Sequence, residues 1–282
     1  MSTRSLRAFA ALFAVGALLQ PVSVPAIAAA VTTVPRFSHV VVVVMENHSL
    51  AEIRGNGNAP YINSLMRTGA NFTNSYGVTH PSQPNYLALF SGSVQGITDD
   101  SCPHYFGAQN LGSQLRSKSL SFAGYSESMP SAGYIGCTSG YYARKHNPWV
   151  DFTNLPSSIN HTMAGFPTSY ASLPTVSFVI PNLQHDMHNG SIAQGDAWLK
   201  AHLSAYVTWA KAHNSALILT WDEDDYSAGN KIPTVIVGAH VRVGSYGESV
   251  NHYRMLRTIE SAYGLSTLGL SAKYSPITDA WN

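Results

Sequence analysis

Residues 38–50, which read SHVVVVVMENHSL, constrain the fold of this chain more than any other segment. Five consecutive valines are too apolar for a strand with one wet face, so they predict a β-strand buried on both faces of a sheet. Glu46, Asn47 and His48 follow at the carboxyl end of this strand, where α/β proteins bind their ligands. For this segment alone, a polar loop that caps the next turn is an equal alternative.

Strand patterns alternate with helical patterns over the rest of the chain. The sequence predicts strands at residues 72–76, 120–125, 176–180, 216–221 and 233–237, and helices at residues 60–66, 85–90, 111–116, 192–213 and 253–263. Such alternation favours an α/β fold with a doubly wound, mostly parallel sheet flanked by helices. Because no repeat or linker interrupts the pattern, we expect a single domain.

The N-terminal residues have the pattern of a secretory signal peptide. Arg4 and Arg7 precede an apolar stretch at residues 8–19, and small residues suited to signal-peptidase cleavage follow at 26–30. The stretch is shorter than the ~20 residues of a membrane span. We therefore expect a signal peptide at residues 1–30 and a secreted mature domain at residues 31–282, with no membrane segment after cleavage. A permanent N-terminal anchor is the alternative.

Charge and cysteine content bear on partners and on redox state. A formal net charge of +1 gives no electrostatic reason to expect nucleic acid as a partner, and we expect a monomer. In an exported protein, Cys102 and Cys137 predict a disulfide, with two free thiols as the alternative. The bond would pin an irregular insertion, residues 126–167, rich in Gly, Ser, Tyr, Asn and Pro.

Polar side chains recur where predicted strands end. They are Glu46 and Asn47, then His185, Asp186 and His188, and finally Asp222 and Glu223. Because the carboxyl ends of parallel strands meet at one edge of a sheet, the clusters form one predicted site. Their carboxylate and amide oxygens suit Mg²⁺, Ca²⁺ or Mn²⁺, and carboxylates also bind Zn²⁺. For Asp222 and Glu223, a solvated acidic turn is the alternative.

Three hydroxyl groups, those of Thr79, Ser82 and Ser91, are candidate nucleophiles. Ser82 lies just before a predicted helix N-terminus, where backbone N–H groups favour an anion such as phosphate. A hydroxyl beside a metal ion can lose its proton and attack phosphorus. The alternative for Ser82 is a helix N-cap.

Three histidines, His146, His188 and His252, are candidates to bind phosphate oxygens or to protonate a leaving group. Each is equally compatible with a surface histidine. His188 is favoured among them because Asp186 lies beside it at the same strand end.

An ordered series of motifs from about His39 to Gly264 resembles a known family. The motifs are MENHS, THPSQPNY followed by FSG, SESMP, RKHNP, PNLQHDMH, TWDE and NHYRMLRTIE. Together they resemble the bacterial phosphoesterase family, which contains secreted acid phosphatases and phospholipases C and belongs to the alkaline phosphatase superfamily. The resemblance implies an alkaline-phosphatase-like fold and a metal-dependent hydrolase of phosphoric esters.

The resemblance also implies roles for individual residues. One divalent ion (Mg, Ca, Mn or Zn) would be bound by Glu46, Asn47, Ser82, Asp222 and Glu223. Ser82 would also be the nucleophile. From the residues themselves, we expect His146 and His188 to be catalytic as well, and we expect substrate contacts from Asn85, His185, Asp186 and His252. The chain departs from the family pattern in carrying Ser82 and Tyr86 where the phospholipases have Thr and Arg, and Glu223 where the family has Asp.

We therefore expect a secreted acid phosphatase that hydrolyses phosphate monoesters through a phosphoserine intermediate. Its substrate would be a small-molecule or lipid-headgroup phosphate ester, with phosphoinositides among the candidates. One alternative is a phospholipase C-type phosphodiesterase on the same scaffold. Another is a non-catalytic secreted protein that binds phosphate ligands, which the complete ligand set disfavours.

Overall fold

The computed structural model describes residues 1–2 and 33–282. The predicted signal peptide therefore lies almost wholly outside the described residues and stays a prediction. The described residues 33–282 belong to one compact unit. None of the helices described in it has the length and apolarity that a membrane span requires.

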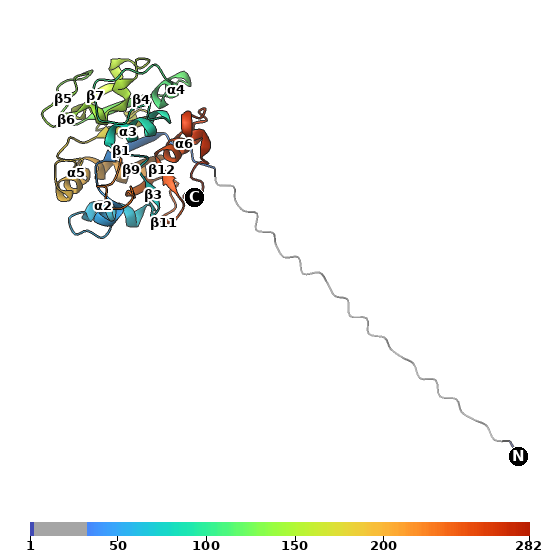
Figure 1. The fold of residues 1–282 in the computed structure, drawn as a ribbon. Coiled ribbons are helices and arrows are strands. Elements are labelled where there is room, and N and C mark those ends of the chain that lie inside the picture. Colours follow the sequence, from blue (N-terminus) through green and yellow to red (C-terminus); the bar gives the residue numbers. More distant parts are fainter. Residues whose placement is uncertain (3–32) are drawn as a thin grey trace. The chain divides into compact units, whose positions relative to one another are not determined.

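An eight-stranded sheet forms the centre of this unit (Figure 1). In spatial order its strands are β11 (Gly244–Tyr246), β2 (Ala70–Phe72), β10 (Thr234–Gly238), β9 (Ser215–Trp221), β1 (His39–Met45), β8 (Val176–Ile180), β4 (Phe122–Ser126) and β7 (Asn160–Thr162). The five strands from β9 to β7 are parallel, whereas β10 is antiparallel to β9 and β2. The predicted, mostly parallel sheet is confirmed.

Helices cover both faces of the sheet (Figure 1). The helices are α1 (Leu50–Ile53), α2 (Pro60–Thr68), α3 (Ser82–Ser91), α4 (Leu111–Ser117), α5 (Ile192–Ala210) and α6 (His252–Tyr263). Val40, Val42 and Val44 of β1 pack in one core with residues of α3, α4 and α6. Val41 and Val43 pack in a second core with residues of α2 and α5. The alternation of side chains along a strand therefore explains why β1 must be apolar at every position.

Two predicted elements differ from the structure. The strand predicted at residues 72–76 is divided by a turn into β2 and β3 (Ser75–Tyr76), because β2 joins the main sheet and β3 pairs with β12 (Val250–Asn251). The helix predicted at residues 192–213 ends at Ala210. Beyond it the chain turns into β9 through Asn214, which has a left-handed φ of 44°.

The insertion predicted as irregular is more regular than expected. It contains the hairpin β5 (Thr138–Ser139) and β6 (Tyr142–Ala143), a short 3₁₀ helix, η1 (Arg144–His146), and strand β7, which extends the main sheet. The predicted disulfide between Cys102 and Cys137 is present. Arg144 is buried and pairs with Asp151 at 2.9 Å, so a paired charge fixes the start of η1.

Candidate active site and metal centre

The register of two central strands brings the first two acidic residues together. Glu46 follows β1 and Asp222 follows β9, and the parallel pairing sets Met45 opposite Trp221. The backbone N–H of Asp222 donates to the carbonyl of Met45 at 3.0 Å. The ends of these two strands therefore meet at one edge of the sheet, as predicted.

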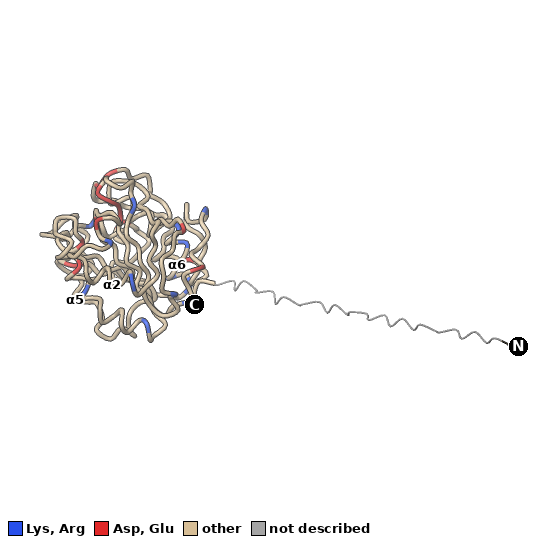
Figure 2. The backbone as a smooth tube through the Cα atoms, turned by 90° about the horizontal axis from the view of Figure 1, so that it is seen from below, with Lys and Arg blue, Asp and Glu red and all other residues tan. Residues whose placement is uncertain are grey.

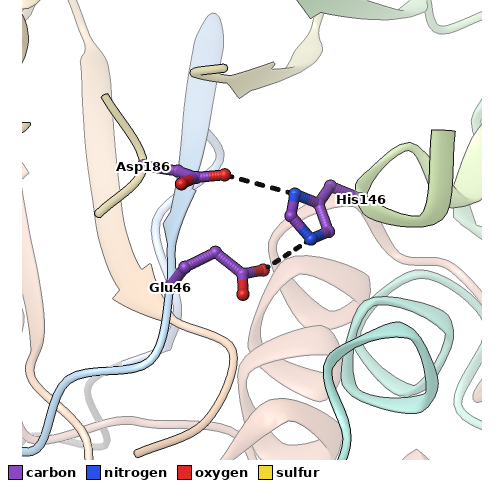
Figure 3. Close-up of side chains that lie close together, drawn as sticks. All are labelled: Glu46, His146 and Asp186. Atoms are coloured by element: carbon purple, nitrogen blue, oxygen red, sulfur yellow. Dashed lines mark ion pairs between the residues drawn. The ribbon is translucent and has the colours of Figure 1, made fainter. Parts of the chain in front are cut away.

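A histidine from the insertion completes a group of three ligand atoms at this edge. His146 lies between Glu46 and Asp186, and Asp186 comes from the loop after β8 (Figure 3). The Nε2 atom of His146 is 3.1 Å from Oε1 of Glu46, and its Nδ1 atom is 3.2 Å from Oδ2 of Asp186. The three side chains are buried and offer ligand atoms that all lie within 4.8 Å of one another.

Ser82 faces the same carboxylates from the start of α3. Its Oγ atom is 3.0 Å from Oε2 of Glu46 and 3.3 Å from Oε1 of Glu223. The residue is 2% exposed, and the N-cap position is occupied by Pro81, which makes no side-chain capping bond. Ser82 is therefore not the N-cap that its sequence context left open, and its hydroxyl points into the acidic cluster.

The other two candidate nucleophiles are engaged elsewhere. The hydroxyl of Thr79 donates to the backbone carbonyl of His80. The hydroxyl of Ser91 donates to the carbonyl of Leu87 at the far end of α3. Of the three candidate hydroxyls, that of Ser82 is the one that contacts the carboxylates of the cluster.

Charged residues are sparse along this chain (Figure 2), yet several buried acidic residues gather at one edge of the sheet. Four carboxylates there, those of Glu46, Asp186, Asp222 and Glu223, are each at most 3% exposed. Burial raises the pKa of Asp186 to about 7. Burial, followed by the charges of neighbouring carboxylates, raises the pKa of Asp222 well above its ordinary range and that of Glu223 to about 8.

The donor set fits a divalent cation. His146 Nε2, Asp186 Oδ2 and Asp222 Oδ2 are buried yet form no hydrogen bond with the described residues, although the first two lie within ion-pair distance of partners. Burial also lowers the pKa of His146 to about 4, so its imidazole is neutral, which is the form that binds metals. A cation would relieve the repulsion among the carboxylates and satisfy the unpaired atoms.

Three other predicted site residues lie beside the cluster. Asn47 has a left-handed φ of 55°, which Asn tolerates, and its backbone N–H donates to Asp222 at 3.3 Å. The amide of Asn85 binds the backbone of Val78 and Thr79 and reaches Glu223 at 3.4 Å. His188 is only partly buried, and its ring centroid is 6.0 Å from that of His146.

Two residues predicted to contact substrate, His185 and His252, form other contacts in the structure. His185 pairs with Glu127 at 2.9 Å, and Glu127 is not one of the four carboxylates of the cluster. His252 is 2% exposed, and its Nε2 atom is 2.6 Å from the backbone carbonyl of Asp222. Burial lowers the pKa of His252 to about 4, so a neutral imidazole contacts the backbone of Asp222.

Sequence reasoning missed two side chains of the site. The hydroxyl of Tyr86 donates to Oε1 of Glu46 at 2.5 Å. His80, which was not among the candidate histidines, lies 2.8 Å from Glu223 and 3.3 Å from Asp224. The spacing of four residues from Ser82 was a usable signal for Tyr86, because residues four apart share one helix face. Nothing comparable marks His80.

The sequence is similar to phosphatases over most of its length. The profile of the Phosphoesterase family matches residues 55–266. Phosphatidylinositol-3-phosphatase from Mycobacterium tuberculosis is 53% identical over 262 residues, which are 92% of this chain and 88% of that protein. Phosphate-repressible acid phosphatase from Penicillium chrysogenum is 30% identical over 231 residues, 74% of this chain, and the match spans 55% of the fungal protein.

Solved structures with a similar fold include a member of the alkaline phosphatase superfamily from Vibrio parahaemolyticus, with a TM-score of 0.57 at 12% identity. That match covers 87% of this chain and 72% of the other. A putative sulfatase from Bacteroides thetaiotaomicron has a TM-score of 0.58 at 12% identity, covering 86% and 74%. At these identities the similarity is one of fold, and it confirms the predicted alkaline-phosphatase-like architecture.

Proposed function

The chain belongs to the Phosphoesterase family, and from this premise we propose that it is a metal-dependent phosphatase that hydrolyses phosphate monoesters through a phosphoserine at Ser82. One observation carries the proposal. The buried hydroxyl of Ser82 lies within 3.3 Å of both Glu46 and Glu223. A hydroxyl in such surroundings can lose its proton to a neighbouring carboxylate and act as a nucleophile.

We propose that one divalent ion, Mg²⁺, Ca²⁺, Mn²⁺ or Zn²⁺, belongs to this site. The residues that would hold it are Glu46, Asn47, Ser82, Asp222 and Glu223, with His146 and Asp186 adjoining through Glu46. When bound, such an ion supplies Lewis acidity that lowers the pKa of a coordinated hydroxyl and offsets charge on phosphate oxygens. In this arrangement the neutral imidazole of His146 adjoins the ion's ligands through its contact with Glu46, which differs from the acid–base role expected from sequence.

The protein's own groups account for the two transfers. In the first, the Oγ atom of Ser82 bonds to phosphorus, the bond to the leaving alkoxide breaks, and His188 at the rim gives that oxygen a proton. In the second, a water oxygen bonds to the phosphorus of phosphoserine and gives a proton to His188, the bond from phosphorus to Oγ of Ser82 breaks, and Oγ regains its proton from the neighbouring carboxylate. The products are one alcohol and one inorganic phosphate.

For the substrate, the similar proteins point to phosphate monoesters, since the mycobacterial relative is named as a phosphatidylinositol-3-phosphatase and the fungal one as an acid phosphatase. We include phosphoinositides and soluble phosphate esters among the proposed substrates. The signal-peptide pattern at residues 1–30 supports secretion of the domain at residues 31–282.

Replacing the nucleophile tests this function. Ser82→Ala is expected to lower the hydrolysis of p-nitrophenyl phosphate by at least roughly a thousandfold while the melting temperature stays close to wild type. Ser91→Ala is the matched control, because Ser91 is a buried serine of the same helix with its hydroxyl bonded to Leu87. Near-full activity in Ser82→Ala would show that Ser82 is not the nucleophile.

A further inference from the structure

The site contains several buried carboxylates, yet a phosphate ester that enters it is itself an anion. Binding therefore calls for positive charge besides the proposed metal ion. Lys145, which directly precedes His146 in η1, supplies such a charge. Its ammonium interacts electrostatically with Glu46, Asp222 and Glu223, so it lies within range of the acidic cluster.

We propose that Lys145 binds the phosphate group of the substrate and that Asp100 is a positioning residue, which holds the ammonium of Lys145 beside the start of α3. The proposal rests on the proposed function and names a substrate-binding group that sequence reasoning did not identify.

The contacts of Asp100 connect the ammonium to the nucleophile. Oδ2 of Asp100 accepts a hydrogen bond from Nζ of Lys145 at 2.7 Å. Oδ1 of the same carboxylate accepts the backbone N–H of Gln83, the residue after Ser82, at 2.9 Å. One carboxylate therefore ties the cation to the first turn of the helix that carries Ser82.

The ammonium retains donors for a ligand. A lysine ammonium has three N–H donors, and Asp100 takes one of them. His188, the proposed acid at the rim, has its Nε2 atom 3.4 Å from Nζ of Lys145. The side chain of Lys145 is 18% exposed, so it is reachable from solvent while its position is restricted. Charge-assisted hydrogen bonds from such a group are among the stronger ones that phosphate accepts.

The adjacent cation, Arg144, forms structural contacts, whereas Lys145 lies within range of the acidic cluster. Its guanidinium is 1% exposed and donates to Asp151 and to the carbonyls of Ile135 and His104. These contacts occupy Arg144 within the insertion and fix the backbone of η1. Lys145 then projects from an anchored backbone toward Asp100, which is the arrangement expected of a preorganised binding group.

Four variants separate phosphate binding from a simple ion pair. Lys145→Met and Lys145→Gln remove the charge, and the second keeps a donor for Asp100. Asp100→Asn keeps the ammonium but weakens its anchor. Lys200→Met, on the exposed side of α5, controls for the loss of one positive charge. The measurements are kcat and KM for p-nitrophenyl phosphate, and the dissociation constant of inorganic phosphate from calorimetry.

We expect both substitutions of Lys145 to raise KM and the phosphate dissociation constant together, by about tenfold or more, with a smaller change in kcat. Asp100→Asn should raise the phosphate constant less, since the charge remains, and Lys200→Met should leave it unchanged. A fifth variant, Lys145→Arg, keeps the positive charge and should retain most of the binding.

Two results would overturn the proposal. The first is a phosphate constant in Lys145→Gln equal to that of Lys200→Met. The second is an equal rise in Lys145→Gln and Asp100→Asn, which is what a purely structural ion pair predicts. The dissociation constant of inorganic phosphate is measured without turnover. An inactive wild-type protein would therefore refute the proposed function, while the phosphate constants of the variants would still test the role of Lys145.

Discussion

Glu46 has two carboxylate oxygens with different partners, and the geometry of the site depends on this division. Oε1 accepts the hydroxyl of Tyr86 at 2.5 Å and lies 3.1 Å from Nε2 of His146. Oε2 accepts the hydroxyl of Ser82 at 3.0 Å. The carboxylate thus connects the predicted ligand set to the group formed with His146. Its orientation is set by a tyrosine on the same helix as the nucleophile.

Removing the hydroxyl of Tyr86 should therefore weaken metal binding. We expect Tyr86→Phe to raise the metal concentration needed for half-maximal activity by roughly 10- to 100-fold, because Glu46 loses the donor that orients it. The ring contact with His146, at 5.0 Å between centroids, can remain in this variant. Metal titration of chelator-treated protein measures the change. Tyr206→Phe is the control, since Tyr206 bonds to Ala216 in the core, and equal titration curves for the two variants would refute the role of Tyr86.

At the residue scale, the sequence allowed prediction of the side chains that follow strands or begin a helix. Glu46 and Asp222 are placed by strand register, and Ser82 by the start of α3. His146 and Lys145 lie on η1, and their approach to the sheet depends on the buried pairing of Arg144 within the insertion. Their partners Glu46 and Asp100 lie in distant segments, and such contacts have no periodic sequence signal, so they could not be predicted.

Among the elements, the long apolar segments could be predicted as strands from their sequence, whereas the pairing of the shorter strands could not. The valine run predicted β1, and the apolar segment at residues 176–180 predicted β8 with its observed bounds. The antiparallel direction of β10 and the division of residues 70–76 between two sheets are set by tertiary pairing. A pattern of alternating side chains does not report strand direction, so these features were not predictable.

The junction of α6 and the 3₁₀ helix η6 (Gly269–Lys273) gives a pH-dependent prediction. Glu260 of α6 is fully buried and accepts hydrogen bonds from the N–H of Leu268 and the hydroxyl of Ser271. Burial raises the pKa of Glu260 from 4.5 to about 7. Between these values the folded chain holds a proton that the unfolded chain releases. The contribution of Glu260 to stability is therefore fully present below the unfolded pKa and declines as pH rises toward the folded pKa.

We expect Glu260→Gln to remove this dependence. The wild type should lose stability relative to the variant as pH rises from about 5 to about 7, by at most about 1.4 kcal/mol per pH unit. Urea unfolding at several pH values in this range measures the difference. Parallel stability profiles for the two proteins would contradict a titration of Glu260 in this window.

At the scale of the whole molecule, the sheet supplies the carboxylates and the insertion supplies the imidazole. Removal of divalent cations should therefore affect activity and stability together. A chelator is expected to abolish p-nitrophenyl phosphate hydrolysis and to lower the melting temperature, because Glu46, Asp222 and Glu223 are left to repel one another. Adding back the cation should restore both properties, with one ion per chain by elemental analysis.

The control for this experiment is chelator that has been saturated with cation beforehand, which should change neither property. If activity and melting temperature both persist after treatment with free chelator and removal of metal is verified, the buried carboxylates serve some purpose other than cation binding.

Trapping the phosphorylated intermediate is a direct test of the attack of Ser82 on phosphorus. Wild-type protein is mixed with p-nitrophenyl phosphate, quenched in acid at a series of times during turnover, and mapped by peptide mass spectrometry. We predict that the peptide containing Ser82 gains one phosphoryl group, located on that serine, and that the modified fraction decays as substrate is exhausted. A phosphoryl group on a histidine, or an unmodified Ser82 peptide at every time point, would contradict the account.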